Sequence, residues 1–196
     1  MSVSNLDSRD RLLNIAQDLF AEKGYVGTTL RDISSKLGIT HASLYYHFPG
    51  GKEELYVEVT EQTILKHGKG LAEFMQADGP SLRGKLRGAA RWLLSSAPMD
   101  LMRMSASDMP ALKEEAARHL MDLVYVHMIV QLRDVVAEAV DKGEIGEETD
   151  SGLIGGAFLG LVESLYSIPE FALTKKRIQM ANELIDIILK GLDYKE

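Results

Sequence analysis

The stretch that decides the fold is TTLRDISSKLGITHASLYYHF, residues 28–48. Apolar residues recur at helical spacing before and after Gly38, and a Gly-Ile-Thr turn separates the two runs. Because each run is short and the turn contains glycine, we predict two helices, residues 30–37 and 41–48, joined as a helix-turn-helix.

Helical signals continue on both sides of this motif. Leu12 to Phe20 show helical spacing, and Gly24 is placed to end that upstream helix. Thr29 is a plausible N-cap of the following helix, with Asp32 completing an imperfect capping box. No alternating strand pattern persists, so the expected fold class is all-α. Further helices are predicted at residues 52–76, 81–96, 111–141, 147–167 and 174–192.

Composition and charge narrow the function. The 196 residues are 45% hydrophobic, contain no cysteine and carry a net charge of −7. Residues 1–52 hold six basic and five acidic side chains, and no acid lies between Asp32 and Glu53, so the charge pattern suits a small, localised DNA contact. The most apolar of the uncharged stretches, residues 151–162, has only 12 residues, and no signal peptide is evident, so we expect a cytoplasmic protein without a membrane partner.

The helix-turn-helix itself suggests DNA binding. In such motifs the second helix lies in the major groove, with its first residues facing base edges. Here that helix opens with His41, Ala42 and Ser43, which are small or hydrogen-bonding, while Leu44 is expected to face the core. A small helical bundle whose tyrosines merely pack is the alternative.

Residues 28–48 resemble the DNA-binding signature of the TetR family. The preceding IAQDLFAEKGYVGTT, residues 15–29, resembles the first helix and exit turn of that family, and Lys-Glu-Glu-Leu at 52–55 resembles the start of its fourth helix. The resemblance implies a three-helix DNA-binding domain at residues 1–52, fused through a long helix to a ligand-binding and dimerisation domain at 53–196. It also implies a repressor that binds a palindromic operator as a homodimer and is released by a small, largely apolar effector.

The resemblance also assigns DNA contacts. Thr29 is expected to bind phosphate through its hydroxyl and the helix N-terminus. Arg31 is also expected to contact DNA. Phe48-Pro-Gly-Gly-Lys52 is one residue longer than the commonest spacing in the family, which leaves the reach of Lys52 open. The expected phosphate contacts or supports are Tyr45, His47 and Lys52, and the residues expected nearest the bases are His41, Ala42, Ser43 and Tyr46.

Two later helices are candidates for a dimer interface. Gly152, Gly156, Gly160 and Ser164 recur every four residues and form one smooth stripe where another helix can approach closely. Packing within one protomer is the alternative, but a repressor that reads two half-sites needs a dimer. The apolar face expected on the last helix consists of Ile178, Ala181, Leu184, Ile185 and Ile188.

A ligand pocket is suggested by methionines. Six of the nine lie between Met99 and Met128, and methionine adapts to varied shapes. For any single methionine, ordinary core filling is the better interpretation. The residues expected to contact the effector are Trp92, Met102, Met121, Tyr125, Met128 and Phe158.

Enzymatic function is not expected, because no phosphate loop, nucleophile elbow or metal-ligand motif is present. We therefore expect no cofactor and no metal. The alternative to a repressor is a helical ligand- or protein-binding module without operator function.

Overall fold

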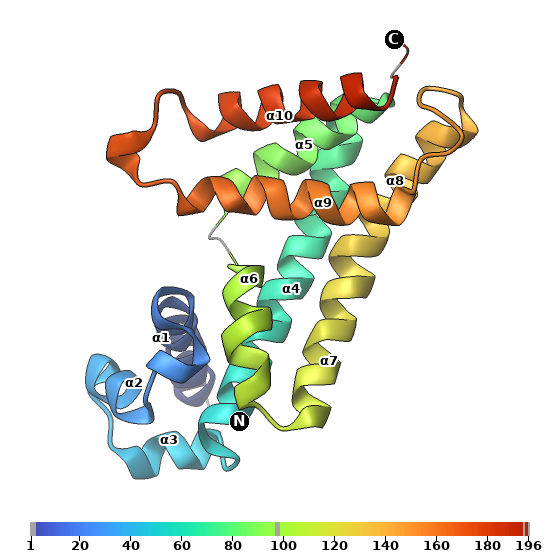
Figure 1. The fold of residues 1–196 in the computed structure, drawn as a ribbon. Coiled ribbons are helices and arrows are strands. Elements are labelled where there is room, and N and C mark those ends of the chain that lie inside the picture. The colour runs from blue at the N-terminus through green and yellow to red at the C-terminus, as the bar shows by residue number, and fades with distance from the viewer. Residues whose placement is uncertain (1–2, 97–98, 194, 196) are drawn as a thin grey trace. The chain divides into compact units, whose positions relative to one another are not determined.

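The computed structural model describes residues 3–96, 99–193 and 195, with side chains from residue 9 onward. Within these ranges every regular element is a helix, as predicted (Figure 1). None of the described helices is both long and apolar enough to cross a membrane. The elements are α1 (Val3–Gly27), α2 (Leu30–Leu37), α3 (His41–His47), α4 (Gly51–Ala77), α5 (Leu82–Ser95), α6 (Leu101–Arg103), the π-helical turn η1 (Met104–Asp108), the 3-10 turn η2 (Met109–Ala111), α7 (Glu114–Val124), the π-helical turn η3 (Tyr125–Ile129), α8 (Val130–Asp141), α9 (Ser151–Ser164), the 3-10 turns η4 (Leu165–Ser167) and η5 (Glu170–Ala172), and α10 (Arg177–Gly191).

The chain forms two compact units. One, the N-terminal unit, comprises Met1–Thr63 and Met99–Met121. The other, the C-terminal unit, comprises Ile64–Pro98 and Asp122–Glu196. The helix-turn-helix thus shares its unit with a second segment of chain that follows about 50 residues later. The functional division at residue 52 that the sequence suggests remains a prediction.

The core of the N-terminal unit fixes the helix-turn-helix. Leu44 of α3 is fully buried, as predicted, and Phe48 directly after α3 is also fully buried. The guanidinium of Arg9 lies 5.0 Å from the centre of the Phe48 ring and pairs with Glu58 of α4 at 2.6 Å. The other buried apolar residues of α1 to α4 in this unit are Leu12, Leu13, Ala16, Leu19, Phe20, Ile33, Leu55, Tyr56 and Val59.

Helix α2 has the two ends that its sequence predicts. Thr29 is the N-cap: its hydroxyl oxygen accepts the Asp32 N–H at 3.1 Å, and the Thr29 N–H donates to the Asp32 carboxylate at 2.9 Å. Gly38 ends the helix with φ at 72°, a left-handed conformation that favours glycine. The capping box that looked imperfect in the sequence is complete.

The segment after α5 differs from the prediction. The sequence predicted a helix from residue 111 and no element between residues 96 and 111, but residues 101–111 are helical as α6, η1 and η2. The Asp100 carboxylate caps this segment by accepting the Arg103 N–H at 3.1 Å. Ser105 and Ser107 weaken the helical signal, so the segment is recognisable only from its contacts. The predicted long helix is present from Glu114 onward, interrupted by η3.

Close helix packing holds the C-terminal unit together. A Cβ atom on Gly88 of α5 would lie 2.2 Å from the Phe74 carbonyl oxygen of α4, and one on Gly155 of α9 would lie 2.8 Å from the Arg133 nitrogen of α8. Both helix pairs therefore pack with backbone against backbone. Glu138 of α8 accepts hydrogen bonds from Lys142 and from Lys85 of α5, and these hold its pKa at about 2.

Candidate nucleic-acid interface

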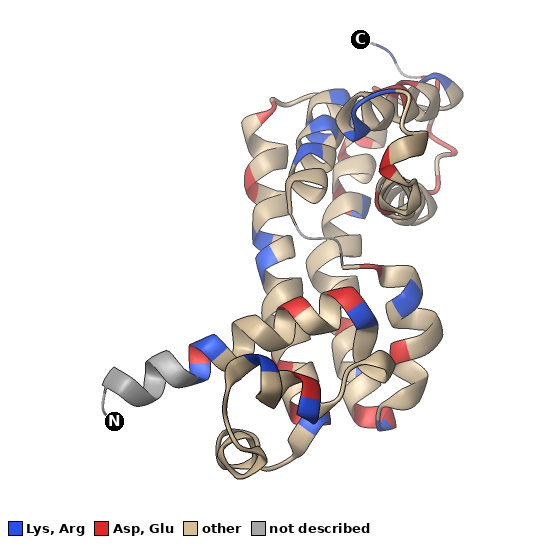
Figure 2. Ribbon diagram, turned by 90° about the vertical axis from the view of Figure 1, so that its left-hand side faces the viewer, with Lys and Arg blue, Asp and Glu red and all other residues tan. Residues whose placement is uncertain are grey.

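Helix α3 presents an exposed polar face. Its N-cap is Thr40, whose hydroxyl accepts the Ser43 N–H at 3.2 Å. His41 and Ala42 at its start are exposed, and Tyr46 is 74% exposed. Residues 37–51 contain no lysine, arginine, aspartate or glutamate, so α3 is without charge colour in Figure 2. The helix can approach base edges without desolvating a charged side chain.

Tyr45 and Tyr46 differ in their surroundings. Tyr45 is 49% exposed, and a Cβ on Gly51 would lie 3.4 Å from its ring, so this ring leans toward the start of α4. The Tyr46 ring packs edge-on against His47, with ring centres 5.3 Å apart. His47 is partly buried, in keeping with a supporting role.

Thr29 is engaged with Asp32 in this conformation. Its hydroxyl donates to the Asp32 carboxylate at 2.6 Å, and these hydrogen bonds from Thr29 lower the pKa of Asp32. Because a hydroxyl has one proton to donate, phosphate binding by Thr29 requires the hydroxyl to leave Asp32. Arg31, next to this cap, is exposed.

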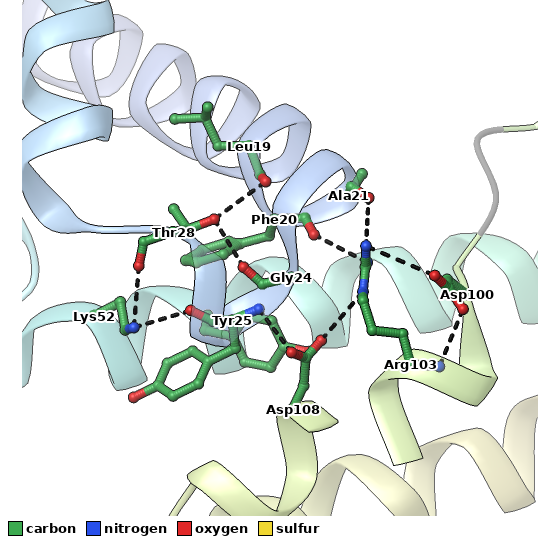
Figure 3. Close-up of polar contacts among 11 residues, drawn as sticks. Leu19, Phe20, Ala21, Gly24, Tyr25, Thr28, Lys52, Asp100, Arg103 and Asp108 are labelled. Atoms are coloured by element: carbon green, nitrogen blue, oxygen red, sulfur yellow. Dashed lines mark hydrogen bonds and ion pairs between the residues drawn. The ribbon is translucent and has the colours of Figure 1, made fainter. Parts of the chain in front are cut away.

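Lys52 makes contacts that the sequence did not predict. Its ammonium group donates to the carbonyl oxygens of Tyr25 at 2.9 Å and Thr28 at 3.1 Å, and it lies 4.0 Å from the centre of the Tyr25 ring (Figure 3). Burial lowers the pKa of Lys52, and the charge of Asp108 opposes this shift. Lys52 therefore binds the turn between α1 and α2, and a role toward phosphate stays a prediction.

Arg103 and Asp108 bind the same turn and were missed in the sequence. Asp108 is 2% exposed, and its carboxylate accepts the Tyr25 N–H at 2.9 Å and the Tyr56 hydroxyl at 3.2 Å. The Arg103 guanidinium donates to the carbonyl oxygens of Phe20 at 3.1 Å and Ala21 at 3.0 Å (Figure 3). Neither residue belongs to a recognisable motif, because their partners are mainly backbone groups.

An acidic groove lies elsewhere in the N-terminal unit. It is open and is lined by Glu53, Glu54, Glu58 and Glu61 of α4 with Lys113. Lys113 pairs with Glu53 at 3.3 Å, and His119 lies 3.1 Å from Glu61. Its predominantly negative wall opposes contact with phosphate, which leaves the α2–α3 surface as the candidate for DNA.

Five of the six predicted effector residues differ in burial and in the unit to which they belong. Met128 and Phe158 fill the core of the C-terminal unit, at 0% and 1% exposed, whereas Tyr125 on η3 is 53% exposed. Met102 and Met121 belong to the N-terminal unit and are exposed. The sequence-based pocket thus combines core and surface residues.

Trp92, the sixth predicted effector residue, lies close against the backbone of α4. A Cβ on Gly70 would come within 1.9 Å of the indole, so glycine is what lets the ring approach the helix backbone. The indole ring lies 5.2 Å from Phe74, centre to centre. Its Nε1 is buried and has no hydrogen-bond acceptor within the described part of the chain. This donor is the one polar group among the six effector candidates that is buried and unsatisfied.

The predicted dimer residues divide into an open stripe and a buried set. A Cβ on Gly156 or Gly160 of α9 would meet nothing within 4 Å, and Ser164 is exposed. On α10, however, Ala181 and Ile185 are fully buried inside the protomer. The prediction that these two side chains face a partner is therefore wrong, because helical spacing alone cannot tell which neighbour covers an apolar face. The partly exposed members of the predicted set are Gly152, Ile178, Leu184 and Ile188.

Similarity to known proteins is strongest at the helix-turn-helix. A family model described as bacterial regulatory proteins, tetR family, matches residues 12–59. The HTH-type transcriptional regulator LmrA of Bacillus subtilis (strain 168) is 42% identical over 71 residues, which cover 36% of this chain and 38% of LmrA. IcaR, the negative transcriptional regulator of the biofilm operon icaADBC in Staphylococcus epidermidis, is 51% identical over 53 residues, which cover 27% of this chain and 28% of IcaR. The matched segments thus span well under two thirds of both relatives.

The likeness in fold extends further. The crystal structure of PfmR, a TetR-family transcriptional regulator from Thermus thermophilus, superimposes with a TM-score of 0.71 at 28% sequence identity. The superposition covers 93% of this chain and 98% of PfmR. The likeness in fold to that regulator is therefore not confined to the helix-turn-helix and extends over nearly the whole chain.

Proposed function

Because the chain belongs to the TetR family of bacterial regulatory proteins, we propose that it is a repressor that binds a palindromic operator as a homodimer and leaves it when a small, largely apolar effector binds. The observation that carries the proposal is α3, an exposed and uncharged helix held by a buried leucine behind a completely capped α2. Such a helix can enter the major groove, while neighbouring polar groups contact the backbone.

The proposal is tested by selecting duplexes from a random pool. A repressor enriches one sequence with two related half-sites, whose centres are about 34–36 Å apart, because a dimer places two recognition helices in successive major grooves. A helical ligand- or protein-binding module without operator function is the alternative. It would enrich no sequence, and a random duplex would compete equally in a gel shift.

The two tyrosines of α3 provide a prediction about readout. Tyr45→Phe is expected to weaken binding to all duplexes by a similar factor, because the hydroxyl is assigned to phosphate, which positions the protein but carries no sequence information. Tyr46→Ala is expected to relax the base preference at one position of each half-site, by roughly 1–3 kcal/mol. Competition titrations against single-base variants of the selected operator measure both effects. A Tyr45→Phe protein with altered base preference, or a Tyr46→Ala protein with an unaltered one, would reverse the assignment.

The homodimer is proposed to form through α9 and α10. Besides the open stripe of Gly156 and Gly160, each of the two helices carries an apolar side chain that the protomer leaves exposed: Leu153 of α9 is 66% exposed, and Ile187 of α10 is 67% exposed. Glycine within a helix costs about 1 kcal/mol relative to alanine, and close packing against a second helix can offset that cost.

Effector binding is proposed in the C-terminal unit, next to Trp92. An apolar effector with one hydrogen-bond acceptor would satisfy the buried indole N–H, and rearrangement of the core residues Met128 and Phe158 would provide room for it. A ligand that binds one conformation preferentially shifts the population toward that conformation and away from DNA.

Trp92 is the only tryptophan, so it reports on this site directly. Titration with effectors that release DNA is expected to change its fluorescence in step with release. Trp92→Phe keeps an aromatic ring over Gly70 but removes the N–H donor. It is expected to lower the affinity for the effector by roughly tenfold, because one hydrogen bond contributes about 1–1.5 kcal/mol. Effectors that release DNA with no change in emission, and that act equally on Trp92→Phe, would place the site elsewhere.

A further inference from the structure

The turn between α1 and α2 must have its backbone groups satisfied by other parts of the chain. The last carbonyl groups of a helix have no partner within it. Gly24 interrupts α1 with φ at 72°, and the following residues 25–28 lead into the cap of α2. The Thr28 hydroxyl shares its one proton between two carbonyl oxygens of α1, that of Gly24 at 2.8 Å and that of Leu19 at 3.2 Å, and so ties the turn to the end of α1.

Arg103 and Asp108, from a later segment of the chain, bind further backbone groups at this turn. Arg103 binds the carbonyl oxygens of Phe20 and Ala21 just before the break, and Asp108 binds the Tyr25 N–H just after it (Figure 3). A Cβ on Gly24 itself would lie 2.8 Å from the Asp108 carboxylate, so glycine is needed here for the approach as well as for its φ. Two side chains from α6 and η1 thereby hold the helix break on both sides.

Arg103, Asp108 and Tyr56 form a cluster in which the buried charge of Asp108 depends on the other two side chains. Asp108 is the only buried carboxylate among the described side chains, and Arg103 faces it at 3.7 Å. Burial, with the charge of Asp108 second, raises the pKa of Tyr56 above its ordinary value, so its hydroxyl stays protonated and donates to Asp108. A buried charge without its partner is strongly destabilising, and this makes the cluster a single arrangement rather than a set of optional contacts.

We propose that Arg103 and Asp108 are positioning residues for DNA recognition, which fix the α1–α2 turn and through it the orientation of the helix-turn-helix. The proposal rests on the proposed operator binding. The direction of α2 is set where the chain leaves α1, and α3 follows α2 after the three residues 38–40. A small rotation at the turn therefore displaces the base-reading side chains of α3, although Arg103 and Asp108 themselves bind protein backbone rather than DNA.

The test uses Arg103→Met and Asp108→Asn in the full chain, with Arg118→Met as the matched control. Arg118 is exposed on α7 and pairs with Glu114 in the preceding turn. Affinity is measured for the selected operator and for a random duplex, at a temperature where circular dichroism shows each variant to be folded. We expect both variants to lose operator affinity by roughly ten- to a hundredfold, as displacement of one base contact per half-site would cause, with the random duplex bound as tightly as by the wild type. The control is expected to match the wild type on both.

Hydrogen exchange provides a readout independent of DNA. In the free protein, amides of residues 19–28 are expected to exchange faster in both variants, and Arg103→Lys, which keeps the charge and one donor to a carbonyl, is expected to recover part of the operator affinity. If Asp108→Asn does not fold, Tyr56→Phe removes one hydrogen bond to Asp108 and is expected to give a smaller loss in the same direction.

The outcomes separate two failures. A wild-type protein that prefers no duplex would overturn the proposed function itself. A wild-type protein that selects an operator, with variants that keep its affinity or keep the exchange rates of residues 19–28, would overturn only the positioning role. Equal loss on the random duplex would also overturn it, because that result means direct contact with phosphate.

Discussion

Gly156→Leu is expected to yield folded monomers that bind the operator about 10²- to 10⁴-fold more weakly than the wild type. A Cβ at this position meets nothing within 4 Å in the protomer, so the leucine is accommodated in the isolated chain. In the proposed dimer, the same side chain would be forced between two closely packed helices, at a cost of about 1–3 kcal/mol or more per protomer. A monomer binds only one half-site. It loses the high effective concentration at which a dimer holds its second recognition helix near the second half-site. Sedimentation velocity and operator titration measure the two effects.

The neighbouring glycine provides a matched control. A Cβ on Gly155 would lie 2.8 Å from the Arg133 backbone of α8, so Gly155→Leu is expected to lower the melting temperature of the protomer itself. Gly156→Leu is expected to leave that of the monomer unchanged or slightly higher, because leucine is the better helix former. A fully dimeric Gly156→Leu protein would move the interface away from this face of α9.

Gly88→Leu is expected to lower the melting temperature by roughly 6–12 °C, which corresponds to about 3 kcal/mol for a chain of this size. A Cβ at Gly88 would lie 2.2 Å from the Phe74 carbonyl oxygen and 2.7 Å from its carbon, so α5 and α4 would have to separate. Backbone atoms cannot rotate away as a flexible side chain can. Thermal unfolding followed by circular dichroism measures the change.

Gly191→Leu is the control for this substitution. Gly191 ends α10, is exposed, and has nothing within 4 Å of a Cβ. The same change of residue is therefore expected to alter the melting temperature by less than about 2 °C, since surface substitutions cost within about 0.5 kcal/mol. If Gly88→Leu unfolds at the wild-type temperature, the close packing of α4 and α5 is not what the structure describes.

Much of the fold could be predicted because its signals are local. Thr29, Asp32 and Gly38 fix the ends of α2 through their own backbone neighbours, and the predicted and observed bounds of α2 agree. Leu44 was recognised as a core residue because its position in α3 follows from the spacing of apolar residues. Residues 101–110 were missed because their helix depends on Asp100 and on contacts with α1, which no short window of sequence contains.

The candidate site was predictable in its location but not in its supports. The uncharged α3 and its exposed histidine and tyrosines are visible in the sequence, since exposure follows from the helix period once Leu44 is inward. The contacts of Lys52 are not, because its partners are the carbonyl groups of Tyr25 and Thr28, and every residue has a carbonyl group. The sequence gives the type of each side chain, but it does not predict which backbone atoms that side chain contacts.

By itself, therefore, the sequence determined the helical class, the helix-turn-helix and which face of α3 is exposed and uncharged, because caps, glycines and apolar period act within a few residues. Only the tertiary structure decided that Ala181 and Ile185 face inward while Gly156 remains open, and that Arg103 and Asp108 hold the α1–α2 turn. The physical reason is the same in both cases. Which neighbour covers a helix face, and which buried charge satisfies a distant helix end, depend on contacts between segments more than 80 residues apart, such as Tyr25 and Asp108.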